Sequence, residues 1–100
     1  MSSPARVLLD EQFAKAEGKG YTLAHDQEHG PRHLILAGHA YTMNALTRQA
    51  RGIAGDGQYL WPFKDGWSPG ADPAVTLVKA AQLLLSAADV LIAESAGGDR

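Results

Sequence analysis

The side chains of this chain that are best suited to chemistry are three histidines, spaced four residues apart. His25, His29 and His33 would share one face of a continuous helix, where imidazoles can ligate zinc. Gly30-Pro31 interrupts that helix, because the residue before a proline avoids helical geometry. We therefore expect His25 to pair locally with Asp26 in a polar, structured loop, and we expect no metal or other cofactor.

The remaining routes to catalysis find little support in the sequence. The chain has no cysteine, which excludes disulfides, cysteine zinc sites and thiol chemistry. No serine stands in a Gly-x-Ser-x-Gly setting, and the glycine-rich segment 52–57 lacks the ending of a phosphate-binding loop. A binding protein is thus favoured over an enzyme.

An aromatic segment and a lone cation offer binding chemistry instead. Four of the seven aromatic residues fall within nine positions: Tyr59, Trp61, Phe63 and Trp67. These rings either fill the core or stack on a planar ligand, which contributes about 1–3 kcal/mol per base. Lys79, alone in an apolar stretch, either meets a phosphate or extends its ammonium group to solvent.

Composition limits the kind of protein. One hundred residues make one domain, residues 1–100, and 17 of the 45 hydrophobic residues are alanine, which favours closely packed helices. The net charge is −2 and the nine basic residues are scattered, which excludes nucleic acid as a partner. No apolar run reaches the roughly 20 residues of a membrane span, so a soluble intracellular protein is expected. Because the core is thin, neighbouring subunits are expected to cover apolar surface in a homo-oligomer.

The aromatic segment and the polar loop must be positioned by helices. Ser3-Pro4 and Asp72-Pro73 each combine an N-cap residue with proline at the first helical position. Gly38 and Ala45 are small enough to let another helix approach closely. The predicted fold is mainly α: a compact domain of three helices, near residues 4–17, 32–51 and 73–95, with two ordered functional loops at 21–31 and 52–72.

The order of these features resembles a widespread group of small phage and prophage proteins. The resemblance covers about residues 10–95 and rests on Gly20-Tyr21-Thr22, His25-Asp26, Trp61-Pro62 and Leu77-Val78-Lys79-Ala80. The same order is more distantly similar to the ryanodine-receptor-type repeat domain. This chain departs from that domain because it lacks an Arg-Asp-Asp run and contains the additional helix near 32–51.

The resemblance implies a phage-encoded binding module that acts in the host cytoplasm against bacterial defence. Its expected ligand is a nucleotide-derived second messenger, either a cyclic dinucleotide or an ADP-ribose derivative. The residues expected to contact that ligand are Tyr21, His25, Asp26, His29, Arg32, Tyr41, Trp61, Trp67 and Lys79. Two alternatives stay open: a metal-dependent nucleotide hydrolase using His25, Asp26 and His29, and a protein-protein adaptor.

Overall fold

Four α-helices and one short 3-10 helix form the fold. The computed structural model describes residues 3–51 and 57–98, and these residues contain no β-strand. The elements are α1 (Pro4–Gly18), α2 (Leu23–His29), α3 (Pro31–Arg51), η1 (Gln58–Leu60) and α4 (Pro73–Gly98). The mainly α class is confirmed, with four α-helices in place of the three expected.

The two proline-marked helix starts are confirmed. The Ser3 hydroxyl accepts a hydrogen bond from the Arg6 amide at 3.2 Å, one turn into α1. The Asp72 carboxylate accepts one from the Ala74 amide at 2.9 Å at the start of α4. These bonds satisfy amides that have no partner inside their own helix. The end of α4 lies at Gly98, three residues beyond the position expected near Ser95.

The polar loop expected at 21–31 is wrong in part, because the structure contains helix α2 there. The Thr22 hydroxyl accepts a hydrogen bond from the His25 amide and caps the helix at its N-terminus. Gly30, with φ +85°, ends the helix before Pro31 starts α3. A seven-residue polar helix has little stability alone, and α2 is held by packing against α3 and α4.

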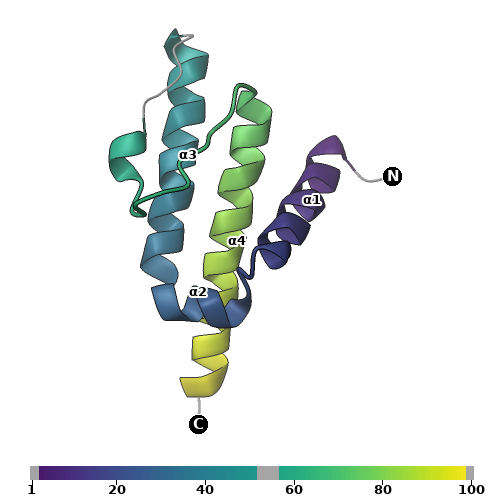
Figure 1. The fold of residues 1–100 in the computed structure, drawn as a ribbon, viewed down its shortest axis with the longest axis vertical. Coiled ribbons are helices and arrows are strands. Elements are labelled where there is room, and N and C mark those ends of the chain that lie inside the picture. Colours follow the sequence, from purple (N-terminus) through teal and green to yellow (C-terminus); the bar gives the residue numbers. More distant parts are fainter. Residues whose placement is uncertain (1–2, 52–56, 99–100) are drawn as a thin grey trace.

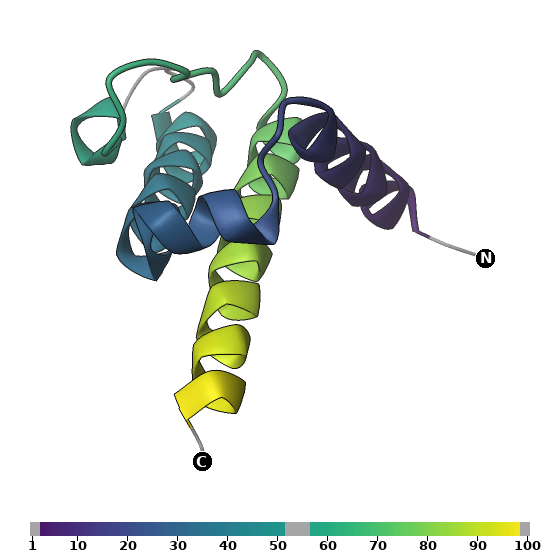
Figure 2. The same ribbon diagram turned by 60° about the horizontal axis from the view of Figure 1, so that its bottom comes forward.

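Helices α3 and α4 form an antiparallel pair that carries the core (Figure 1). Helix α1 lies on the opposite side of α4 from α3, and α2 crosses the pair (Figure 2). The core cluster joins Leu34 of α3 to Ala87 and Val90 of α4. As expected, Gly38 allows a close approach: a Cβ atom there would lie 2.8 Å from a methyl carbon of Leu84.

Helix α4 is the most apolar segment of the chain. Pro73–Ala96 is long and apolar enough, by length and composition, to cross a membrane, which corrects the expectation that no segment meets this test. The core helices of soluble proteins pass the same test. Here α4 packs against α1, α2 and α3 and buries the polar side chains of Thr76 and Ser86 among them.

Candidate ligand-binding site

One pocket of about 490 Å³ brings together residues from all four helices and from the aromatic segment. Its volume lies within the range of about 300–1,000 Å³ that is usual for small-molecule sites. Seven of the nine predicted site residues line it: Tyr21, His25, Asp26, His29, Tyr41, Trp61 and Lys79. Segments that are more than fifty positions apart in the sequence thus line the same pocket.

The other two predicted site residues lie outside the pocket wall. Trp67 stacks on Tyr41 with a ring separation of 5.1 Å and nearly parallel planes, so it supports a wall residue from behind. Arg32, in the first turn of α3, is exposed and does not line the pocket.

All four lysines of the chain line this pocket, a feature that the sequence did not reveal. Lys15 and Lys19 come from α1 and its end, Lys64 from the aromatic segment, and Lys79 from α4. They face two carboxylates, Asp26 and Asp65, which leaves the pocket with a formal excess of positive charge on a chain of net charge −2.

The pKa of Lys79 reflects its partial burial and the positive charge of the pocket. Partial burial lowers the pKa of its ammonium group, and the charges of Lys15 and Lys19 lower that pKa further. Its Nζ atom donates a hydrogen bond to the carbonyl oxygen of Ser68. Like charges held close in a partly dry site favour an anion that neutralises them.

The aromatic segment is fixed by hydrogen bonds at several points. The Trp61 indole nitrogen donates to the carbonyl oxygen of Asp65 at 2.9 Å. The Tyr41 hydroxyl accepts from the Ser68 amide at 3.2 Å and donates to the Gly66 carbonyl. Burial raises the pKa of the Tyr41 hydroxyl, and the backbone bond from Ser68 partly opposes that rise. The segment is therefore held in place without help from a ligand.

Eight rings form a connected series from α2 to α3. Tyr21 contacts His25, His25 contacts His29 at 4.6 Å, and His29 meets the Phe63 ring edge-on at 5.8 Å. The series continues through contacts of 5.0–5.4 Å among Phe63, Trp61, Tyr41 and Trp67, and His33 stacks on Phe63. Ring packing accounts for Trp67, whereas Tyr21, Trp61 and Phe63 also face the pocket.

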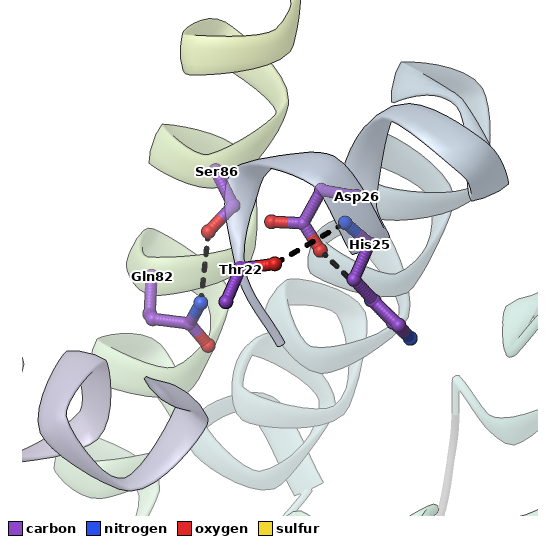
Figure 3. Close-up of polar contacts among 5 residues, drawn as sticks. All are labelled: Thr22, His25, Asp26, Gln82 and Ser86. Atoms are coloured by element: carbon purple, nitrogen blue, oxygen red, sulfur yellow. Dashed lines mark hydrogen bonds and ion pairs between the residues drawn. The ribbon is translucent and has the colours of Figure 1, made fainter. Parts of the chain in front are cut away.

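The expected local pair of His25 and Asp26 is present in the pocket floor. The ring nitrogen Nδ1 of His25 lies 3.4 Å from a carboxylate oxygen of Asp26, a residue only 8% exposed (Figure 3). On α4, the Gln82 amide donates to the Ser86 hydroxyl at 2.9 Å, and Gln82 also lines the pocket (Figure 3). The pocket thus offers amide, imidazole and carboxylate groups from Gln82, His25 and Asp26.

The three histidines do not form a shared metal site in the described part of the chain. The break at Gly30 separates α2 from α3, and the Nδ1 atom of His33 lies 2.8 Å from the carbonyl oxygen of His29. Across residues 3–51 and 57–98, no three or more His, Asp or Glu side chains are grouped so that they could hold a metal ion.

Several wall residues were missed by sequence reasoning, and one signal could have found some of them. Gln12, Lys15 and Lys19 follow helical spacing and lie on one side of α1. That pattern marks a polar helix face, but only the packing of α1 on α4 turns this face toward the pocket. Phe63 was recognised as part of the aromatic segment but was not among the expected ligand contacts, and Lys64 and Asp65 were not considered.

Comparisons of the chain with protein-family models, with curated proteins and with solved structures found no match.

Proposed function

We propose that this chain is a small phage-encoded protein that binds a nucleotide-derived second messenger of bacterial immunity and sequesters it in the host cytoplasm. The observation that carries the proposal is the gathering of all four lysines with a row of aromatic rings in one pocket. Nucleotides combine a planar base with anionic phosphates, and both halves find complementary groups here.

Each class of wall residue has a role in this proposal. Tyr21, which is 49% exposed, and Trp61 offer ring faces on which a base can stack. The polar floor of His25, Asp26 and His29 meets ribose hydroxyls or phosphate edges. Lys79 and the other lysines meet phosphate, and Trp67 holds Tyr41 in position.

Sequestration requires affinity and abundance but no reacting group on the protein. The direct test is calorimetry of the purified protein against a panel of cyclic dinucleotides and ADP-ribose derivatives. We expect stoichiometric binding of at least one member, and recovery of that compound intact after heat denaturation of the complex. Absence of binding by folded protein to every member would overturn the proposal, and recovery of a cleaved product would favour the hydrolase alternative.

Two variants sharpen this test. Lys79→Gln removes a charge from the pocket, whereas Arg6→Gln removes one from an exposed position on α1 that does not line it. Both change the net charge of the chain equally. Lys79→Gln should weaken binding at least about tenfold, as expected for loss of a charge-assisted hydrogen bond, while Arg6→Gln should leave it unchanged.

We also propose that the chain forms a homo-oligomer through the apolar side of the α3–α4 pair. Leu77, Leu84 and Leu91 recur every seven residues on α4 and remain 42–48% exposed. Because α4 has 26 residues, it is about 39 Å long. With a helix diameter of about 10–12 Å, α4 alone presents about 400–470 Å². The adjoining face of α3, which exposes Leu46 next to Leu77, brings the area toward the roughly 800 Å² per partner of a stable interface.

A further inference from the structure

We propose that the ligand carries two directly joined phosphates, as a nucleoside 5′-diphosphate or its ester, held by Lys15, Lys19 and Lys79 with the base against the rings of Trp61 and Phe63. This inference rests on the proposed function and narrows it to one chemical class. It concerns the arrangement of charge within the pocket.

The positive charge is concentrated where α1 meets α4. Lys15 and Lys19 stand four residues apart, so they lie about one turn from each other on the same side of α1. Helix α1 packs against α4, and both of its lysines act electrostatically on Lys79. Lys79 therefore links the two lysines of α1 to the aromatic segment, because its Nζ atom also donates a hydrogen bond to the carbonyl oxygen of Ser68. Lys64 comes from the aromatic segment itself.

The rings lie toward the other side of α4. Tyr41 belongs to α3, and Trp61 and Phe63 belong to the segment that runs alongside α3 before it reaches α4 (Figure 1). Helices α1 and α3 flank α4 on opposite sides in both ribbon views (Figure 2). The pocket thus has an end formed by Lys15 and Lys19, on the side of α1, and an aromatic end formed by Tyr41, Trp61 and Phe63.

This arrangement distinguishes two ligand classes that share bases and phosphates. A diphosphate presents two or three negative charges within a single compact group, which matches three converging lysines. A cyclic dinucleotide carries two separate phosphates of one charge each on opposite sides of its ring. It would need a phosphate site on each side of the pocket, and beyond the three lysines that interact where α1 packs on α4 only Lys64 remains for the second site.

The experiment compares four probes by calorimetry at one ionic strength: AMP, ADP, ADP-ribose and cyclic di-AMP. We expect ADP and ADP-ribose to bind at least about tenfold more tightly than AMP, which corresponds to about 1.4 kcal/mol, and more tightly than cyclic di-AMP. Equal binding of AMP and ADP, or tightest binding of cyclic di-AMP, would overturn the inference and leave the proposed function standing. Failure of every nucleotide to bind would overturn both.

Variants locate the diphosphate within the pocket. Lys15→Gln combined with Lys19→Gln should reduce the affinity for ADP to that for AMP, so that the ratio between them falls to about one. Lys64→Gln should weaken both nucleotides alike and preserve the ratio, and Arg6→Gln should change neither affinity. A ratio that collapses with Lys64→Gln and survives in the double variant would place the diphosphate at the aromatic end, contrary to the inference. Circular dichroism confirms that each variant is folded.

Discussion

Tyr41 holds the aromatic segment to helix α3 through its hydroxyl group. The side chain is buried, accepts a hydrogen bond from the Ser68 amide, and contacts the rings of Trp61 and Trp67. Tyr41→Phe keeps the ring contacts but leaves that amide without its side-chain acceptor. We expect the free energy of unfolding to fall by about 1–2 kcal/mol in a urea titration. Tyr59→Phe is the matched control, because Tyr59 is 78% exposed, and it should change stability very little.

The same hydroxyl gives stability a dependence on alkaline pH. Burial raises the pKa of Tyr41 above its ordinary value of 10.0, so the unfolded chain ionises first as the pH rises. The contribution is constant below pH 10 and is lost progressively above it. The stability of Tyr41→Phe should therefore decline less steeply than that of the wild type between pH 10 and 11. Parallel curves would contradict the burial of this hydroxyl.

Lys79 combines a structural bond with an unfavourable charge. Its pKa is lowered, so folding disfavours the charged form at every pH below that lowered value. The penalty disappears only as the pH rises toward the ordinary value of 10.5. Lys79→Met removes the penalty and also the hydrogen bond to Ser68. We expect unfolding free energies at pH 7 to match within about 1 kcal/mol, with nucleotide binding lost. A larger loss of stability would make Lys79 a structural residue.

Gly57 is the glycine with the tightest surroundings on the described chain. Its φ is +102°, and a Cβ atom would collide with the carbonyl oxygen of Ala40 and lie 3.1 Å from the Asn44 amide nitrogen. Both atoms belong to the backbone of α3, which cannot move aside cheaply. Gly57→Ala should destabilise the protein by about 2 kcal/mol or more in thermal or urea unfolding.

Gly18 provides the comparison for that substitution. A Cβ atom at Gly18 meets nothing within 4 Å, and the residue closes helix α1. Gly18→Ala should be neutral or stabilising by up to about 1 kcal/mol, because alanine favours helix. Similar effects at the two glycines would contradict the close packing of Gly57 on α3.

At the scale of elements, helix ends were easier to predict than helix α2. The starts of α1 and α4 follow from local chemistry, because an N-cap and a proline act within one turn. Helix α2 is polar, and its stability comes from a Thr22 cap and from contacts with α3 and α4. Those contacts join residues that are distant in sequence, so no local sequence pattern predicts them.

The residues of the candidate site also differ in how well the sequence predicted them. Residue types with evident chemistry, such as His25, Asp26 and Lys79, drew attention in the sequence and lie in the pocket. In the sequence, Lys15 and Lys19 resemble solvated charges on a helix face. Only the packing of α1 against α4 places both of them at the pocket. Trp67 is the opposite case. Its residue type suggested a ligand contact, but its ring stacks on Tyr41 and does not line the pocket.

Helix α1 has fewer packing partners than any of the other three α-helices. Among the elements of the described chain it packs only against α4, whereas α2 packs against both α3 and α4. We expect its backbone amides to exchange with deuterium faster than those of α3 and α4, because local opening costs less there. A nucleotide diphosphate should slow exchange in α1 by engaging Lys15 and Lys19. Exchange in α1 as slow as in α4 without ligand would contradict this expectation.

At the scale of the whole molecule, the pocket and the exposed apolar face lie on different sides of α4. Lys79 and Gln82 line the pocket, and Leu84 of the exposed face lies two residues, or about 200° around the helix, from Gln82. A second copy docked on that face would leave the pocket open. Each copy then binds its own ligand without residues from a neighbour.

Light scattering coupled to gel filtration tests this arrangement. The wild type should elute as an oligomer, and Leu77→Glu with Leu84→Glu should be monomeric with unchanged nucleotide affinity, because neither side chain reaches the pocket. Val7→Glu, which introduces one glutamate at an exposed apolar position on α1, should remain oligomeric. A monomeric wild type would overturn the proposed oligomer, and weaker nucleotide binding by the monomer would place the interface at the pocket.

The single packing partner of α1 has a kinetic consequence. Two of the three lysines proposed to hold the diphosphate belong to a helix that only α4 retains. Under the proposed function, the residence time of the ligand would be set by how often α1 opens away from α4, and not by the slower unfolding of the α3–α4 pair. Residues on the α1–α4 contact that touch no ligand would lengthen or shorten that time, so the duration of capture would be tuned separately from the choice of ligand.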